Sequence, residues 1–384
     1  MAEFRFEDIA INSTTKKKPV EEDKYHYLGL EHLDSGTFTV SRFGSDVAPI
    51  GDKLIMKKGD VLFGKRRAYQ KKVAIAPFDG IFSAHGMVLR PNESVIDKDF
   101  FPLFIASDYF LDKAIAISVG SLSPTINWRD LKELEFYLPS LEEQKKLAET
   151  LWSIVDTMES YKKLLAKIDE MVNSEFVRKN LEWKTERKLL GDFIEQIRGV
   201  SYKPNDLYIN HTEGTVVLLR ANNITLDTGN INFDEVQFVS NKKVSIEQYI
   251  KLNDIIMCAS SGSLEHVGKT ALCNDDCVNK TFGAFCKLIR VSNKQLNPIY
   301  LQSYFSTQEY KNIISNLANG SNINNLKNEH IDKLEVPMPT IEQQNEFATF
   351  VQKSKESKSA IQASLDNLNK VYKKIIAENL GGTN

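Results

Sequence analysis

The side chains best suited to chemistry in this sequence are cations gathered on one short segment. Residues 53–72 contain eight lysines and arginines and a single carboxylate, that of Asp60. Tyr69 and Gln70 lie among these cations. Lysine and arginine bind phosphate, and arginine also pairs with guanine, so the segment is typical of a nucleic-acid contact. The alternative is a charged hairpin that only faces water.

Polar residues elsewhere extend this prediction to two different sets of contacts. In the first half of the chain the candidates are Arg42, Lys65, Arg66, Arg67, Tyr69, Gln70, Lys71 and Lys72, with Ser121, Ser123 and Asn127 in a later loop. In the second half they are Arg198, Tyr202, Lys203, Arg220, Asn222, Ser260, Ser261, Ser263, His266 and Lys269, with Asn322, Asn324 and Lys327 in the corresponding later loop. Asparagine pairs with adenine as arginine pairs with guanine. Because the two halves of the chain carry different polar residues, we expect them to bind different base sequences. For the two later loops turn and cap chemistry is an equal alternative.

Three segments resemble catalytic motifs but each lacks an essential feature. Gly262–Thr270 has five residues between its glycines, where a phosphate-binding loop needs four. Asn297-Pro298-Ile299-Tyr300 lacks the second proline of the adenine methyltransferase motif, and we expect a helix start there instead. The four cysteines, at 258, 273, 277 and 286, lack the CxxC spacing of a zinc site, which favours buried free thiols. We therefore expect no catalytic site and no metal in this chain.

The candidate residues are distributed over an internal repeat with an offset of 200 residues. Gly120-Ser121 matches Gly320-Ser321, and Leu134-Glu135 matches Leu334-Glu335. The repeat predicts a domain at 1–138, a helix at 139–183, a second domain at 184–336, and a second helix with a tail at 337–384.

Each predicted helix carries an apolar stripe. Apolar residues recur every three or four positions from Leu147 to Val172 and from Phe347 to Ile375, although Ser354 and Lys358 interrupt the second stripe. Such heptads predict that the two helices pack on each other as a coiled coil. The alternative is that each helix packs only on its own domain.

The regions that precede the helices are predicted to be mixed α/β (α+β). Short apolar runs bounded by Gly, Asp and Asn predict strands at 61–63, 73–75, 87–89, 215–219 and 255–257. Helical stretches follow at 101–117 and 298–317. We expect a curved antiparallel sheet in each domain.

Composition restricts the class of protein further. The chain has 384 residues, 42% of them hydrophobic and 26% charged, and no apolar run approaches the ~20 residues of a membrane helix. The acidic, polar N-terminus does not resemble a secretion signal, and the few cysteines fit a cytoplasmic protein. The net charge of −2 alone argues weakly against binding to DNA, so cations would have to be sorted onto one face.

The order of variable domain, Pro-x-[Leu/Ile]-Glu-x-Gln and long helix, present twice, resembles the specificity (S) subunit of type I restriction–modification enzymes. Leu138–Gln144 and Met338–Gln344 carry the motif, and the resemblance covers nearly the whole chain. It implies two pseudo-two-fold-related target-recognition domains, each reading half of a bipartite site in double-stranded DNA. It also implies that the two helices form an antiparallel coiled coil that sets the spacer between the half-sites.

The same resemblance implies a non-catalytic subunit that assembles two methyltransferase (M) subunits and restriction (R) subunits for adenine methylation and ATP-dependent cleavage. S-adenosylmethionine, ATP and Mg²⁺ are then expected on the partner subunits, with no cofactor in this chain and no membrane contact. Two other hypotheses are a fused enzyme, which the missing cofactor loop disfavours, and a scaffold that binds no nucleic acid.

Overall fold

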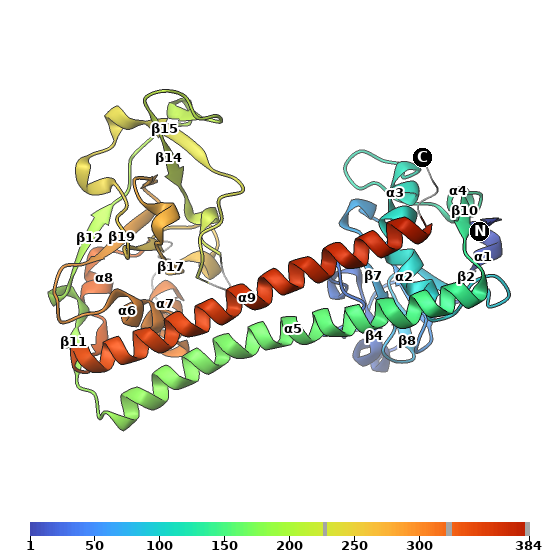
Figure 1. Ribbon diagram of the computed structural model, residues 1–384, viewed down its shortest axis with the longest axis horizontal. Coiled ribbons are helices and arrows are strands. Elements are labelled where there is room, and N and C mark those ends of the chain that lie inside the picture. The colour runs from blue at the N-terminus through green and yellow to red at the C-terminus, as the bar shows by residue number, and fades with distance from the viewer. Residues whose placement is uncertain (226–228, 320–324, 381–384) are drawn as a thin grey trace. The chain divides into compact units, whose positions relative to one another are not determined.

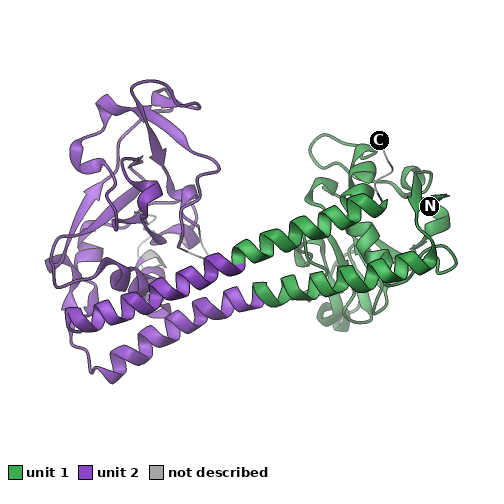
Figure 2. Cartoon of the chain, viewed as in Figure 1, with its two compact units in different colours: residues 1–162, 362–384 green, residues 163–361 purple. Residues whose placement is uncertain are grey.

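The computed structural model describes residues 1–225, 229–319 and 325–380, which separate into two compact units (Figure 2). Unit 1 comprises residues 1–162 and 362–384, and unit 2 comprises residues 163–361. Each unit therefore holds one β-rich region and part of both long helices. This division differs from the predicted one, in which the helices at 139–183 and 337–384 stood apart, because each helix packs closely on a β-rich region.

The β-rich region of unit 1 contains three sheets (Figure 1). β1 (Ala2–Arg5) pairs with β10 (Glu135–Leu138). One four-stranded sheet has the order β2 (Ala10–Ser13), β9 (Met87–Pro91), β6 (Val61–Phe63) and β7 (Val73–Ile75). The other has the order β3 (Lys16–Lys17), β5 (Lys53–Met56), β8 (Gly80–Phe82) and β4 (Tyr27–Leu28).

Unit 2 repeats this construction with one change. β11 (Arg187–Leu189) pairs with β20 (Glu335–Pro337), and a four-stranded sheet has the order β12 (Ile194–Arg198), β19 (Cys286–Val291), β16 (Ile255–Cys258) and β17 (Thr270–Leu272). The second four-stranded sheet has the order β13 (Leu207–Tyr208), β15 (Gln237–Ser240), β14 (Thr215–Leu219) and β18 (Thr281–Phe282). The first two sheets of the two units thus share one strand order, and the third does not.

All the predicted strands are present and most pairs are antiparallel as expected, but each unit contains three sheets where one was predicted. Each unit also contains a parallel pair, β4 with β8 in unit 1 and β14 with β18 in unit 2. Apolar patterning along one strand does not specify which strand lies beside it, so this pairing was outside the prediction.

The two predicted helical stretches are each divided in two. In unit 1 they are α2 (Phe100–Ala106) and α3 (Asp108–Ala116), and in unit 2 they are α6 (Pro298–Phe305) and α7 (Gln308–Asn319). The breaks fall at Ser107 and Thr307, whose hydroxyls accept the backbone N–H groups of Phe110 and Tyr310. These are N-caps, which start a new helix where the sequence pattern alone predicts continuation.

Short helices complete both units. The α-helices are α1 (Phe6–Ile9), α4 (Trp128–Leu131) and α8 (Asn328–Asp332). The 3₁₀ helices are η1 (Glu21–His26), η2 (Leu30–His32), η3 (Ala68–Gln70), η4 (Leu190–Asp192), η5 (Pro204–Asp206), η6 (Ala221–Asn223), η7 (Asn241–Lys243), η8 (Ile246–Gln248), η9 (Leu264–His266) and η10 (Asp275–Cys277).

The long helices are α5 (Leu141–Glu182) and α9 (Ile341–Leu380), which pack on each other as predicted, so the alternative that each packs only on its own domain is wrong. Within unit 1, Leu151 of α5 and Ile376 of α9 belong to the same buried core as Phe136 of the β-rich region. Within unit 2, the rings of Phe176 and Phe347 lie 5.4 Å apart, centroid to centroid. The start of each helix therefore meets the end of the other, so the helices pack on each other antiparallel and on the β-rich regions as well.

The polar interruption of the α9 stripe has a partner on α5. Lys358 Nζ donates to both carboxylate oxygens of Asp169, at 2.6 and 2.8 Å. The polar residue Lys358 is therefore accommodated between the two helices by an ion pair within unit 2.

The repeated Pro-x-[Leu/Ile]-Glu-x-Gln motif fixes the start of both long helices. Ser140 and Glu143 form a reciprocal capping box, and Thr340 and Gln343 form the same one before α9. The glutamine that ends the motif, Gln144 or Gln344, is completely buried.

Candidate nucleic-acid interface

The turn after β6 in unit 1 brings the triplet Lys65–Arg67 against the polar loop that precedes α4. The N–H of Ile126 donates to the carbonyl of Lys65 at 2.9 Å, and the N–H of Arg67 donates to that of Pro124 at 2.8 Å. Arg66 Nε also donates to Ser123 Oγ at 3.1 Å. Two of the predicted contact regions, far apart in sequence, therefore form one surface.

A third segment, the turn between β8 and β9, completes this surface. The N–H of Arg66 donates to the carbonyl of His85 at 3.2 Å, and Arg66 Nη1 lies 3.3 Å from His85 Nε2. Partial burial and the charges of Arg66, Lys65 and Lys53 lower the pKa of His85. Partial burial and Lys16 lower the pKa of Lys65. We call Lys65, Arg66, Arg67 and His85 the basic cluster.

The basic cluster carries uncompensated positive charge. Among the described residues, Lys65, Arg66 and Arg67 form no ion pair, and the charges that depress the pKa of His85 are all cationic. Cations held close together without carboxylates indicate an anion as the expected partner.

Other predicted cations of unit 1 have partners inside the protein instead. Lys71 donates to Asp108 at 2.7 Å and to Asp112 at 2.9 Å, and Lys72 donates to the carbonyl of Leu30. Arg42 pairs with Asp34 at 2.6 Å. Lys71 and Lys72 are therefore already bound to atoms of unit 1, and the chain turns sharply at Arg67 and Lys71, where φ is +54° and +49°.

The remaining candidates of unit 1 flank the basic cluster. Tyr69 is 56% exposed and Gln70 half-buried in η3, directly after Arg67. Ser121 is exposed in the loop before α4. Asn127 is exposed at the N-cap of α4 without a side-chain capping bond, so its amide is not committed to the helix.

Unit 2 builds the same three-segment surface with different side chains. The N–H of Leu326 donates to the carbonyl of Ala259 at 2.7 Å, and the N–H of Ser260 donates to that of Phe285 at 3.0 Å. Ser260 and Asn325 form an isolated β-bridge, as Arg66 and Thr125 do in unit 1. The positions of Lys65, Arg66 and His85 are thus taken by Ala259, Ser260 and Phe285.

Several candidates of unit 2 lie in or beside this surface. Ser261 and Ser263 follow Ser260 in the turn, and His266 ends η9, which follows it. Lys327 is exposed just after the Asn325 segment, whereas Asn322 and Asn324 lie outside the described residues.

The other candidates of unit 2 divide between surface and interior. Arg198 and Lys203 are exposed and Tyr202 is half-buried, on a segment that runs beside the Phe285 turn. There the N–H of Ala284 donates to the carbonyl of Val200 at 3.0 Å.

Arg220 and Asn222 lie around η6, Asn222 exposed and Arg220 half-buried. Lys269 points inward, because its Nζ donates to the carbonyl of Ile224 at 2.7 Å and burial lowers its pKa.

His85 and Phe285 were not among the predicted contacts, although the sequence contains the signal. Phe82-Ser83-Ala84-His85 and Phe282-Gly283-Ala284-Phe285 match at the repeat offset of 200. The phenylalanine and the alanine match, and of the two positions that differ, His85/Phe285 is the exposed one, whereas Ser83 is buried.

Two of the three segments that resemble catalytic motifs have structural roles. All four cysteines are buried free thiols. Asn297 caps α6 by accepting the N–H groups of Ile299 and Tyr300, as the helix-start interpretation predicts. Within the described ranges no three His, Cys, Asp or Glu side chains are grouped to hold a metal ion, and no helix there is long and apolar enough to cross a bilayer.

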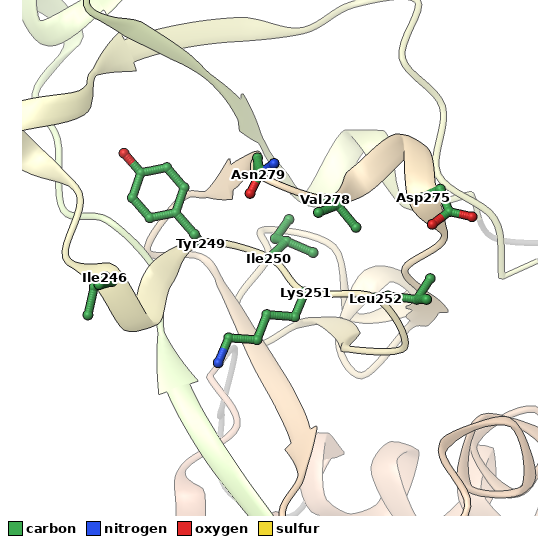
Figure 3. A pocket seen from close by; sticks show the side chains of 8 residues that line it. All are labelled: Ile246, Tyr249, Ile250, Lys251, Leu252, Asp275, Val278 and Asn279. Atoms are coloured by element: carbon green, nitrogen blue, oxygen red, sulfur yellow. The ribbon is translucent and has the colours of Figure 1, made fainter.

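A hollow of about 670 Å³ opens in unit 2 between residues 246–252 and 275–279 (Figure 3). Most of its lining is apolar, with Ile246, Ile250 and Leu252 on one side and Val278 on the other. None of the predicted contacts lines it, so it is separate from the three-segment surface of unit 2.

The fold defines a class of protein in which one scaffold is present twice and displays two different sets of loops. The chain belongs to the type I restriction modification DNA specificity domain family, whose model matches residues 2–170 and 182–369. That match in two copies agrees with the internal repeat.

Known relatives carry names consistent with this family. The chain is 31% identical over 193 residues to the type I restriction enzyme StySPI specificity subunit of Salmonella potsdam, and 30% identical over 188 residues to the EcoKI specificity subunit of Escherichia coli K12. These matches cover 49% and 48% of this chain, but only 40% and 39% of the relatives.

A solved structure supports the fold over the whole chain. The crystal structure of the type I restriction–modification S subunit from M. genitalium aligns with 100% of this chain and 96% of its own, with a TM-score of 0.56 and 14% identity. The predicted architecture, two similar domains and two long antiparallel helices, is confirmed.

Proposed function

We propose that this chain is the DNA-recognition subunit of a type I restriction–modification system and reads a bipartite site in double-stranded DNA. The observation that carries the proposal is the pair of three-segment surfaces, which share a hydrogen-bond frame and differ in side chains. Two surfaces with the same backbone hydrogen bonds but different side chains can read a DNA site whose two halves differ in sequence. Family membership supports the same conclusion.

The proposed contacts are narrower than the sequence candidates. In unit 1 they centre on the basic cluster with Tyr69, Ser123 and Asn127. In unit 2 they centre on Ser260, Ser261 and Asn325, with Lys327, whose exposed amino group lies 3.5 Å from a carboxylate oxygen of Glu329. Lys71, Lys72 and Lys269 are left out because their amino groups already bind atoms of the protein.

The chain is proposed to act without catalysis of its own, as the names of its relatives suggest. Two methyltransferase subunits and the restriction subunits would assemble on it, and S-adenosylmethionine, ATP and Mg²⁺ would bind to those partners. α5 and α9 would set the distance between the two half-sites.

Charge reversal of the basic cluster tests this proposal. In the variant K65E/R66E/R67E, each lost phosphate contact makes the plot of log affinity against log salt concentration shallower by about 0.9, so the loss of the two contacts of Lys65 and Arg67 makes it shallower by about 2. Affinity for a specific duplex falls accordingly, and fluorescence anisotropy over a salt series measures both quantities.

The matched control is K58E/K98E/K145E, which changes the net charge of unit 1 equally at three exposed lysines outside the cluster. It is expected to change affinity much less. Equal losses in both variants would mean that only net charge matters, and unchanged affinity in the first would remove the basic cluster from the interface.

A further inference from the structure

We propose that the turns at 83–86 and 283–286 each determine one base of the two half-sites. Phe285 would contact the methyl group of a thymine directly, and His85 would hold Arg66 in position to read a guanine. The inference rests on the proposed function and assigns base choice within it.

The two turns are built alike. Gly86 N–H donates to the Ser83 carbonyl at 3.0 Å, and Cys286 N–H donates to the Gly283 carbonyl at 2.8 Å. Phe82 and Phe282, which anchor the turns, are completely buried. The residue at the tip, His85 or Phe285, therefore projects from a fixed backbone, which is the rigidity that base readout needs.

Phe285 combines exposure with a polar neighbourhood. Its side chain is 63% exposed, although Cys286 beside it and Phe282 three residues earlier are fully buried. Ser260 donates its N–H to the carbonyl of Phe285, and Asn325 is bridged to Ser260. An exposed aromatic ring among groups that can pair with base edges is suited to the thymine methyl, which is the apolar feature of the major groove.

His85 acts on Arg66 and not on the base itself. Arg66 Nη1 donates to His85 Nε2, which must then be the unprotonated ring nitrogen, and Arg66 Nε donates to Ser123 Oγ. The guanidinium is thus held at two points while its other N–H groups stay available. Bidentate pairing of arginine with guanine needs that fixed orientation.

The test of Phe285 combines a protein variant with a base analogue. The full chain, co-purified with its partner subunits, is titrated with the specific duplex and with duplexes in which each thymine is replaced by uracil. One replacement in the second half-site is expected to weaken wild-type binding about fourfold, which corresponds to one buried methyl group. Phe285→Ala is expected to bind both of these duplexes equally.

Two control variants accompany this measurement. Phe285→Leu keeps an apolar contact and is expected to retain the preference for thymine. Ile246→Ala removes another highly exposed apolar side chain of unit 2 and is expected to change nothing.

His85 has a separate test. His85→Ala is expected to relax the preference for one guanine in the first half-site only, and His85→Gln, which can still accept from Arg66, is expected to restore it. A preference that His85→Gln does not restore would overturn the positioning role.

The outcomes separate the inference from the proposed function. If wild type selects a sequence and Phe285→Ala keeps every base preference, the inference fails while the function stands. Loss of partner subunits from Phe285→Ala with unchanged preference would likewise overturn it, by assigning the ring to a protein contact. If wild type selects no sequence, the proposed function itself fails.

Discussion

Lys287 is a buried cation whose surroundings link the sheet of unit 2 to the proposed interface. Its side chain is 6% exposed, and its Nζ donates to Gln196 Oε1 and Asn328 Oδ1, both at 2.9 Å. Asn328 begins α8, immediately after the exposed Lys327. Burial, opposed by Asp332, lowers the pKa of Lys287 to about 8.

This shift predicts a pH dependence of stability. The unfolded chain holds the Lys287 proton up to about pH 10.4, whereas the folded chain releases it near pH 8. Between these values the unfolded state binds more protons, so the free energy of unfolding rises with pH through this window. Lys287→Met, which introduces the residue that Met87 provides at the repeat position in unit 1, removes that contribution.

Denaturant unfolding of wild type and Lys287→Met at about pH 7.5 and about pH 9.5 measures the effect. The wild type is expected to gain stability relative to the variant at the higher pH. Because the other titrating groups are common to both proteins, an unchanged difference would contradict the assigned shift.

At the residue scale, the sequence points to candidate contacts where the relevant side chains are neighbours in the chain. The triplet Lys65–Arg67 was identified because its cations are adjacent. Lys71 belonged to the same run, but its partners Asp108 and Asp112 lie 37 and 41 positions away, and a local charge count cannot reveal them. His85 and Phe285 were not predicted as contacts, because neither a single histidine nor a single apolar residue is a signal by itself. Only the alignment of the two repeats shows that they occupy the same position.

At the scale of elements, the glutamine of the repeated motif connects each long helix to its β-rich region by hydrogen bonds. Gln144 Nε2 donates to the carbonyls of Val95 and Pro139, and its Oε1 accepts the N–H of Asp97 at 2.8 Å. Gln344 makes the equivalent bonds to Gln295, Pro339 and Asn297. A buried side chain with all its polar atoms paired explains why the motif occurs in both copies.

Gln144→Leu is therefore expected to destabilise unit 1. The change leaves the Asp97 N–H and two carbonyls without their partner, and each buried unpaired group costs about 1–3 kcal/mol. Lys145→Leu, at the exposed neighbouring position, is expected to change the free energy of unfolding by less than about 0.5 kcal/mol. Denaturant unfolding compares the two, and similar values would show that the glutamine bonds contribute little.

The ends of an element were predictable where the sequence shows both a helical spacing of apolar residues and a residue that caps the helix. The heptads and the Pro-Ser or Pro-Thr starts predicted α5 and α9 closely. The breaks at Ser107 and Thr307 were not predicted, because the apolar pattern continues across them and only the tertiary packing turns each serine or threonine into a cap. Parallel pairing of β4 with β8 depends on contacts between distant segments, which patterning within a strand does not encode.

At the scale of the whole molecule, the repeat changes the meaning of the net charge of −2. A chain with a net negative charge can still bind an anion where its cations are gathered on one part of the surface. In unit 1 the basic cluster is such a part of the surface. The described positions of unit 2 that match the basic cluster, Ala259, Ser260, Ser261 and Phe285, include no cation, so the two units would contribute unequally to phosphate binding and differently to base choice.

The central claim, that the chain directs a DNA-modifying assembly to a bipartite sequence, is tested most directly by mapping adenine methylation in its host. Genomes of the wild type, of a strain lacking this chain and of the complemented strain would be sequenced for modified bases. The account predicts that methylation at one bipartite motif disappears without the chain and returns on complementation. An identical methylation map in all three strains would contradict it.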